Sequence, residues 1–387
     1  MENNKIDLFI SRCTYWEGKL YCLARDFNLA FSVDSQTGVV ELLDVVPEGD
    51  ILTPYLCGDM NAWGDKLIFT PNRAKKIWLY DLSSKHWDGL TVNKYEHWGP
   101  GGIYQTYVYE NKLFLIGGSY PAIICLDLKN NSCDYIEEPY EEIMAREPEI
   151  DHHFFRLHGV RIENTLYLAS CLDNFVLKFD METRKHQWIK VGEEGQQYVG
   201  IAWDGSHFWL SPFRNTDFIK WDGNENIKTL SISHNLEQEP NMYLWGARYD
   251  GSQIIFPCVS HPKSIRIDTT NDTLQFYDEQ YSLFKRFDNG VVVNQTINGD
   301  LTIRTDDSSP KTYHPAVDVD ELAQFYEERN KKVFLEQTLY YEGPKHFLTS
   351  LEGFTTLAKP EFENNQTASG QVGKTIWEAI SKAHRSE

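Results

Sequence analysis

A short phrase of apolar and polar positions recurs seven times along the chain. Each copy begins with an aromatic or apolar residue, continues through a polar turn and ends in a short apolar segment, as between Trp16 and Tyr21. Apolar residues occupy alternate positions in the segments beside these turns, and a period of two is typical of half-buried β-strands. Each copy therefore predicts a β-hairpin. The copies begin at Trp16, Trp63, Tyr109, Ile162, Trp203, Tyr249 and Phe287.

An aspartate follows each copy at a fixed distance. It lies 14 residues after the apolar position that follows the turn, which is Leu20 in the first copy. A carboxylate at the end of a strand can accept hydrogen bonds from the backbone N–H groups ahead of it and so form a turn. We therefore interpret these aspartates as turn formers and not as catalysts. They are Asp34, Asp81, Asp127, Asp180, Asp222, Asp268 and, in a degenerate seventh copy, Asp306.

The two features define a repeating unit of four strands: strand, hairpin, strand, polar loop, strand, aspartate turn and strand. Consecutive copies lie 38 to 53 residues apart, which is close to the period of four-stranded propeller blades. Such a unit cannot bury both of its faces alone, and radial stacking of neighbours buries them. The sequence predicts an all-β protein whose residues 6–314 form a seven-bladed β-propeller. Six blades are the alternative if the last unit merges with another.

The repeated phrase Tyr/Trp-x-Gly/Asn-Lys-Leu-Tyr, followed by Ile-x-x-Tyr-Asp, resembles kelch-type and related bacterial β-propellers. Two later segments, 350–354 and 373–378, resemble parts of uncharacterised bacterial propellers, some of them encoded near polysaccharide-assembly genes. The glycine pair of true kelch repeats occurs only at Gly117 and Gly118, and the signatures of WD repeats are missing from their usual places. The resemblance implies the architecture and indicates almost nothing about a reaction.

The chain after the repeats predicts a helical extension. Residues 317–330 carry Leu322, Phe325 and Tyr326 at helical spacing. A short amphipathic helix at the end of the chain is marginal by itself, so we expect it to dock on the ring or on a protein partner. The predicted divisions are the propeller over 6–314, a helical and strand extension packed on it over 315–359, a linker over 360–373 and a short C-terminal helix over 374–387.

Composition and charge narrow the choice of partners and compartment. The 387 residues include 37 Lys and Arg against 57 Asp and Glu, a formal net charge of −20. Neither nucleic acid nor an anionic membrane attracts such a surface, so we predict no partner of either kind. No stretch predicts a signal peptide or a membrane span. Seven cysteines without a CxxC pair favour buried, reduced thiols and a cytoplasmic protein; a disulfide between Cys125 and Cys133, which flank one tight turn, is the alternative.

Basic residues recur in the polar loop between the second and third strands of the units. In a ring, these equivalent loops would point toward one mouth of the central channel, where propellers bind most of their ligands. A guanidinium fork suits a carboxylate, phosphate or sulfate. The structural alternative is that each cation pairs with a local acid such as Asp26 or Asp217. The candidate ligand-binding residues are Arg25, Arg73, Arg214 and either Lys263 or His261.

A second group of candidates enters the fourth unit. Arg156 and His158 share one face of a predicted strand, with His152 and His153 in the loop before it. Imidazoles near carboxylates can ligate a metal or transfer protons. The spacing matches no known metal motif, so these histidines are weak candidates for a divalent metal site, and we predict no cofactor. A buried structural histidine is the alternative.

Other loops mix aromatic and amide groups, which suit the face and the hydroxyl groups of a sugar ring. Tyr104 and Trp245 are the candidates there, and packing between blades is the alternative.

The first functional hypothesis is a binding propeller for a polar, anionic saccharide or peptide-like ligand at the channel mouth. The second is a lyase or hydrolase of an acidic saccharide, in which His158 or His261 moves the proton. The third is a scaffold that docks a protein partner through the C-terminal helix.

Overall fold

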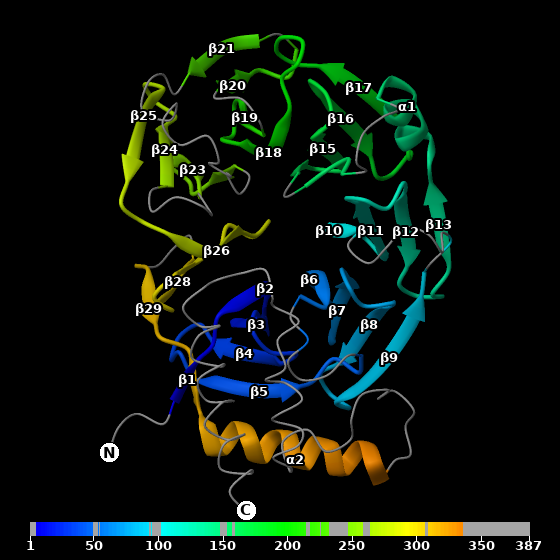
Figure 1. The fold of residues 1–387 in the computed structure, drawn as a ribbon, viewed down its shortest axis with the longest axis vertical. Coiled ribbons are helices and arrows are strands. Elements are labelled where there is room, and N and C mark those ends of the chain that lie inside the picture. The colour runs from blue at the N-terminus through cyan, green and yellow to red at the C-terminus, as the bar shows by residue number, and fades with distance from the viewer. Residues whose placement is uncertain are drawn as a thin grey trace, which may run out of the picture.

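The computed structural model describes residues 5–48, 53, 55–92, 94, 102–147, 153–156, 159–213, 217–224, 226–231, 247–257, 264–305 and 309–335. Seven antiparallel sheets of four strands form a closed ring (Figure 1). The seven-bladed propeller is thus confirmed, and the alternative of six blades is wrong.

Each blade is a continuous stretch of chain, and its strands pair in the order of the sequence. The first blade consists of β2 (Ile10–Trp16), β3 (Lys19–Ala24), β4 (Ala30–Asp34) and β5 (Val40–Asp44). The second blade consists of β6 (Cys57–Trp63), β7 (Lys66–Pro71), β8 (Lys76–Asp81) and β9 (His86–Thr91). The third blade consists of β10 (Ile103–Tyr109), β11 (Lys112–Gly117), β12 (Ile123–Asp127) and β13 (Cys133–Ile136). The fourth and fifth are β14 (Val160–Ile162), β15 (Thr165–Ala169), β16 (Phe175–Asp180) and β17 (His186–Lys190); β18 (Tyr198–Trp203), β19 (Phe208–Pro212), β20 (Asp217–Trp221) and β21 (Asn226–Ser231). The last two are β22 (Arg248–Tyr249), β23 (Gln253–Phe256), β24 (Ser264–Asp268) and β25 (Thr273–Tyr277); β26 (Tyr281–Arg286), β27 (Val292–Thr296), β28 (Leu301–Arg304) and β29 (Lys311–Tyr313).

The turns follow from local chemistry. In the first hairpin, Glu17 and Gly18 both have a positive φ, of 46° and 80°, as a two-residue turn matched to the twist of the strands requires. In the turn after β4, Asp34 Oδ1 accepts the N–H groups of Gln36 at 2.9 Å and Thr37 at 2.8 Å. These backbone donors lower the pKa of Asp34.

The other aspartates of the repeat behave in the same way, which confirms their role as turn formers. Each accepts a backbone N–H from two or three residues ahead, and Asp306 lies outside the described residues. The carboxylates are those of Asp81, Asp127, Asp180, Asp222 and Asp268.

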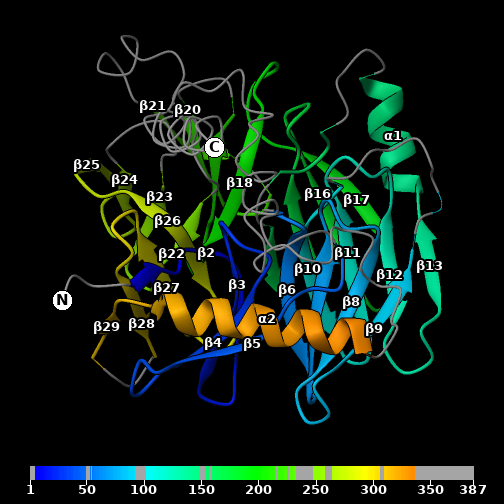
Figure 2. The same ribbon diagram turned by 60° about the horizontal axis from the view of Figure 1, so that its bottom comes forward.

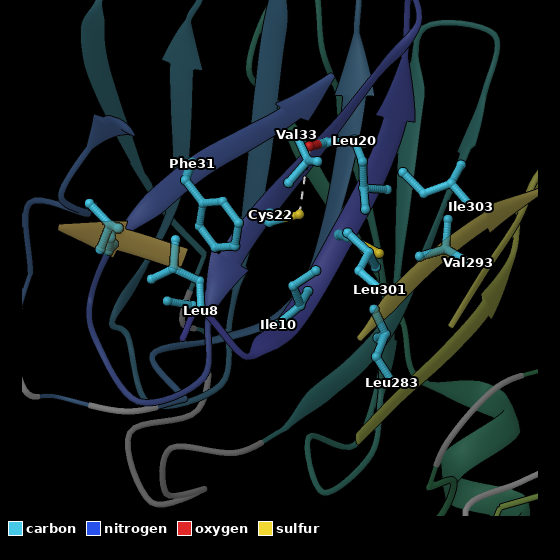
Figure 3. Packing of buried hydrophobic residues seen from close by; sticks show 14 of the residues in the cluster. Leu8, Ile10, Leu20, Cys22, Phe31, Val33, Leu283, Val293, Leu301 and Ile303 are labelled. Atoms are coloured by element: carbon cyan, nitrogen blue, oxygen red, sulfur yellow. Dashed lines mark hydrogen bonds between the residues drawn. The ribbon is translucent and has the colours of Figure 1, made fainter. Parts of the chain in front are cut away.

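The core is divided among the interfaces between blades. The largest cluster joins the first blade to the seventh and so closes the ring: Figure 3 shows Leu20 and Phe31 of the first blade in the same cluster as Leu283 and Ile303 of the seventh. Beside this interface, a two-stranded sheet pairs β1 (Lys5–Asp7) with β30 (Ala316–Asp318). Both ends of the described chain therefore take part in closure.

Two helices supplement the ring. The helix predicted over 317–330 is confirmed as α2 (Val319–Leu335), which lies beside β5 on the outside of the first blade in both views (Figures 1 and 2). Leu322 and Tyr326 are buried in the cluster that joins the first and seventh blades. The sequence did not predict α1 (Glu138–Arg146), which precedes the fourth blade. The predicted linker over 360–373 and the helix over 374–387 lie outside the described residues.

Two simpler predictions concern thiols and membranes. Cys125 and Cys133 are both free. The strand register pairs Cys125 with Asp134 and Leu126 with Cys133, so the two thiols lie on opposite faces of the sheet and the alternative of a disulfide is wrong. In the described part of the chain, neither helix is long and apolar enough to cross a membrane.

Candidate functional site at the centre of the ring

The strand registers place the predicted loops at one end of the ring. Ile10, Cys57 and Ile103 begin the first strands of three blades, and they pair with residues at the ends of the second strands. The loop between the second and third strands therefore lies beside the start of the first strand. We call this side of the molecule the loop end.

Two predicted arginines of these loops are described. The Arg25 guanidinium donates two hydrogen bonds to Asp26, both at 3.0 Å, and lies 4.3 Å from the centre of the Phe9 ring. It thus pairs with its local acid, as the structural alternative supposed. Arg73 has an exposed side chain, and its N–H donates to the carbonyl of Leu56 at 3.0 Å.

Tyr104 and Arg156 lie at the same end, over the third, fourth and fifth blades. The Arg156 guanidinium lies 4.4 Å from the centre of the Phe213 ring. The ring of Tyr104 covers Gly118, where an added Cβ would come within 2.5 Å of that ring and 3.0 Å of the Phe155 carbonyl. Only glycine fits this approach, which gives the second member of the Gly-Gly pair a packing role.

Of the remaining predicted site residues, the structure describes His153 alone, and the roles of all of them stay predictions. His153 is described and half-buried. Among the described residues, no three His, Cys, Asp or Glu side chains gather in a group that could hold a metal ion. The predicted residues that lie outside the description are His152, His158, Arg214, Trp245, His261 and Lys263.

The innermost strands carry charged residues that the sequence analysis did not select. The first strand of each blade is its innermost, and most of these strands contact one another around the ring (Figure 1). Their registers define two levels of equivalent positions. The upper level, nearer the loop end, holds Arg12, Asp59, Gln105, Gly200 and Leu283; the lower level, two residues further along, holds Thr14, Asn61, Tyr107, Val160, Ala202, Arg248 and Lys285.

Asp59 is fully engaged by its neighbours. Its carboxylate accepts the N–H and the hydroxyl of Thr106, both at 2.9 Å, and the N–H of Met60 at 2.8 Å. The Lys285 ammonium lies 3.1 Å from the same carboxylate and donates to the carbonyl of Cys13 at 2.9 Å. A lysine of the seventh blade thereby contacts the first and second blades, which places its ammonium between blades near the centre. The charges of Asp59 and Lys285 balance each other.

Arg12 and Arg248 are held in one common manner. Nη1 of each donates to the carbonyl of the preceding residue at 2.6 Å. Nε of each donates to a carbonyl of the next blade: that of Gly58 for Arg12, and that of Phe284 at 3.3 Å for Arg248. Gly58 and Phe284 immediately precede the positions equivalent to the two arginines. We call this arrangement the carbonyl clamp.

The clamp gives neither guanidinium group a counter-charge, because it consists of neutral carbonyl groups. Among the residues that the structure describes, neither group forms an ion pair with a carboxylate, and neither Nη2 has a hydrogen-bond acceptor. Arg248 is only 8% exposed and Arg12 is half-buried. Burial lowers the pKa of both guanidinium groups, against an opposing effect of Asp59. The described residues of the two levels thus carry a net positive charge, from Arg12, Arg248 and Lys285 against Asp59, in a protein whose net charge is −20.

Neighbouring groups fix the clamp in place. A Cβ on Gly58 would come within 1.6 Å of the Ile103 carbonyl, so the second blade can approach the third only with glycine there. The Tyr107 hydroxyl donates to Gln105 at 2.9 Å, and burial raises the pKa of this tyrosine. A neutral phenol within the electrostatic influence of Arg248 adds polarity without charge.

A usable signal for these residues was present in the sequence. Arg12 lies eight residues before Leu20, and Arg248 lies six before Ile254, counted from the same repeat positions that located the aspartates. The loops were aligned across the units and the first strands were not, so the candidates chosen from the sequence do not include these two arginines of the innermost strands.

Comparisons with known proteins support the architecture. No protein-family model matches the chain, and no curated protein matches it. Among solved structures, virginiamycin B lyase from Staphylococcus aureus is 14% identical, with a TM-score of 0.57 over 76% of this chain and 94% of that one. A streptogramin B lyase is 15% identical, with a TM-score of 0.54 over 81% and 97%. A chain of a mitotic checkpoint complex is 10% identical, with a TM-score of 0.52 over 80% and 93%. At identities this low, the likeness shows a shared β-propeller fold and carries no information about activity.

Proposed function

We propose that the protein is a ligand-binding propeller that recognises a polar, anionic ligand, a saccharide or a peptide-like molecule, at the loop end of the ring centre. The observation that carries this proposal is the pair of clamped guanidinium groups, Arg12 and Arg248, without carboxylate partners in the described chain. Tyr104 and Arg156 lie at the same end and offer an aromatic ring and a further cation to the same ligand.

The physical reason is the free energy of the unbalanced charges. Removing a cation from water without a counter-charge is costly. An anion bound at Arg12 and Arg248 would recover part of that cost through charge-assisted hydrogen bonds to the Nη2 groups, which have no acceptor among the described residues. A ligand that binds only the folded state then raises its melting temperature.

Thermal-shift measurements with matched pairs of ligands test the proposal. Glucuronate is compared with glucose, and an acidic peptide with its amidated form, at constant pH and ionic strength. We expect the acidic member of at least one pair to raise the melting temperature and the neutral member to leave it unchanged. Arg12→Gln should remove this shift.

Arg184→Gln is the matched control, because Arg184 pairs with Asp134 at 2.9 Å on an outer turn. It should retain the shift of the unmodified protein. Equal shifts from acidic and neutral members, or an acidic shift that survives Arg12→Gln, would contradict the proposal.

The other two hypotheses rest on features beyond the described residues. A lyase or hydrolase needs the proton-transfer roles predicted for His158 and His261, and two of the similar structures are a virginiamycin B lyase and a streptogramin B lyase. A scaffold would use the predicted C-terminal helix, and a protein partner fits a fold that also occurs in the mitotic checkpoint complex. Binding of an anion at Arg12 and Arg248 requires neither feature, and for that reason we place it first.

A further inference from the structure

We infer that the centre of the ring binds a ligand with two anionic groups, one held by Arg12 at the upper level and one by Arg248 at the lower level. This inference rests on the proposed function, since it specifies the ligand of the same site. It selects dianions, such as a dicarboxylate or two acidic units of one chain, over molecules with a single acidic group.

The argument begins with the shared clamp. In both arginines, Nη1 donates to the carbonyl of the preceding residue and Nε donates to a carbonyl of the next blade. The same two nitrogens are therefore engaged in each arginine, and in both the Nη2 group has no acceptor among the described residues. Two guanidinium groups held alike in two different blades offer the same donor edge twice. A single carboxylate can satisfy one such edge.

The two clamps stand at different heights in the ring. The carbonyls that hold Arg12 belong to Ser11 and Gly58, and those that hold Arg248 belong to Ala247 and Phe284. The registers place the second pair two residues deeper along the innermost strands. At about 3.3 Å per residue, two residues correspond to about 7 Å along the strand direction.

The neighbouring charges of the described residues are paired with each other and not with the two arginines. Lys285 and Asp59 satisfy each other at 3.1 Å, and Asp59 takes its other hydrogen bonds from the second and third blades. Asp59 also keeps a second anion from binding at its own position by charge repulsion. The ligand's two acidic groups are therefore expected at the two arginines, separated by at least the difference in height.

A series of α,ω-dicarboxylates measures that separation directly. Binding of succinate, glutarate, adipate, pimelate and suberate to the unmodified protein is measured by calorimetry, with propionate as the single-carboxylate reference. We expect succinate to bind no better than propionate, because its carboxylates lie too close together. Adipate or a longer member should bind about tenfold tighter, as one additional charge-assisted hydrogen bond would provide.

Two variants assign the carboxylates to their arginines. Arg12→Gln and Arg248→Gln should each reduce the best dicarboxylate to the affinity of propionate, whereas Arg184→Gln should leave the series unchanged. If Arg248→Gln does not fold, the chain-length series and Arg12→Gln still decide the question.

The outcomes separate the two proposals. Carboxylates that bind with an affinity independent of chain length would overturn the inference and leave the proposed function standing. Failure of every carboxylate, together with failure of the acidic sugars and peptides, would overturn both. A dependence on chain length that survives Arg12→Gln would assign the site elsewhere and overturn the inference.

Discussion

At the scale of single residues, His314 lies in the chain between β29 and β30 and contacts a carboxylate with each nitrogen of its ring. Nε2 is 3.1 Å from Asp7, and Nδ1 is 3.0 Å from Asp300. Hydrogen bonds to Asp300 and Asp7 raise the pKa of His314 above its ordinary value. Only the protonated ring donates from both nitrogens. The stabilisation is therefore complete below the unfolded-state pKa of about 6.5 and is lost as the pH rises through the higher folded-state pKa.

We expect His314→Gln to lower the melting temperature at pH 5.5 and to have little effect at pH 9. Because the side chain is 45% exposed, solvent screens the pair, and the loss at pH 5.5 should be about 1–3 °C. His86→Gln is the control, since His86 is 67% exposed and has one carboxylate at 3.7 Å. If His314→Gln lowered the melting temperature equally at both pH values, His314 would stabilise the fold by packing and not by its charge.

At the scale of single residues, the sequence predicts the role of the turn aspartates but does not predict the role of the cations at the centre of the ring. A carboxylate such as Asp34 acts on N–H groups two and three residues ahead, so its role is visible in a short stretch of chain. Arg12 instead acts on a carbonyl 46 residues away, in the next blade. Its role depends on the strand register and on a β-bulge between Ile10 and Arg12, which shifts every later side chain of β2.

At the scale of elements, an ion pair links helix α2 to the first blade. Arg329 Nε lies 2.6 Å from the Asp44 carboxylate at the end of β5, and their side chains are 15% and 8% exposed. The other oxygen of Asp44 accepts the Trp87 indole N–H at 3.0 Å. Removal of the arginine would take the nearby positive charge of Arg329 away from a buried carboxylate.

We expect Arg329→Met to lower the free energy of unfolding by about 2–4 kcal/mol, because breaking a buried pair costs far more than breaking an exposed one. Lys19→Met is the matched control: Lys19 pairs with Glu41 at 2.9 Å, with both side chains exposed, and should cost less than about 1 kcal/mol. Urea unfolding of both variants gives the comparison. Similar losses in the two variants would mean that α2 is held by its apolar contacts alone.

The elements themselves were largely predictable. Alternating apolar positions and the constant distance of 14 residues to the turn aspartate located all seven blades, and apolar residues at helical spacing located α2. The missed helix α1 is only nine residues long, too short for periodicity to separate it from a loop. The longest interval between copies, the 53 residues from Leu113 to Leu166, marked the insertion that contains it.

At the scale of the whole molecule, the ring must close on itself, and no local pattern specifies how. Each blade supplies its own four strands, so no shared strand joins the first blade to the seventh. Closure comes from the apolar cluster of Figure 3, from the β1–β30 sheet and from one buried amide. Every blade needs both neighbours to bury its faces. Loss of contacts between the first and seventh blades therefore lowers the stability of the entire ring.

Gln295 is that amide, and it offers the sharpest test of closure. Its side chain is fully buried; Oε1 accepts the Ile10 N–H at 2.8 Å, and Nε2 donates to the Leu8 carbonyl at 2.9 Å. Gln295→Met keeps the size of the side chain and leaves both backbone groups without their partner. We expect the free energy of unfolding to fall by about 2–4 kcal/mol, in a single transition.

Gln187→Met is the matched control, because Gln187 is exposed on the outer strand β17, and it should change the free energy of unfolding by no more than about 0.5 kcal/mol. A second transition in Gln295→Met, with part of the ring unfolding first, would show that the blades do not depend on closure. A loss no larger than that of the control would mean that the apolar cluster and the β1–β30 sheet close the ring without the amide. A single transition with a large decrease in the free energy of unfolding would instead show that the two hydrogen bonds at the interface of the first and seventh blades stabilise all seven blades. The physical reason is that an open ring leaves the faces of its first and last blades in water.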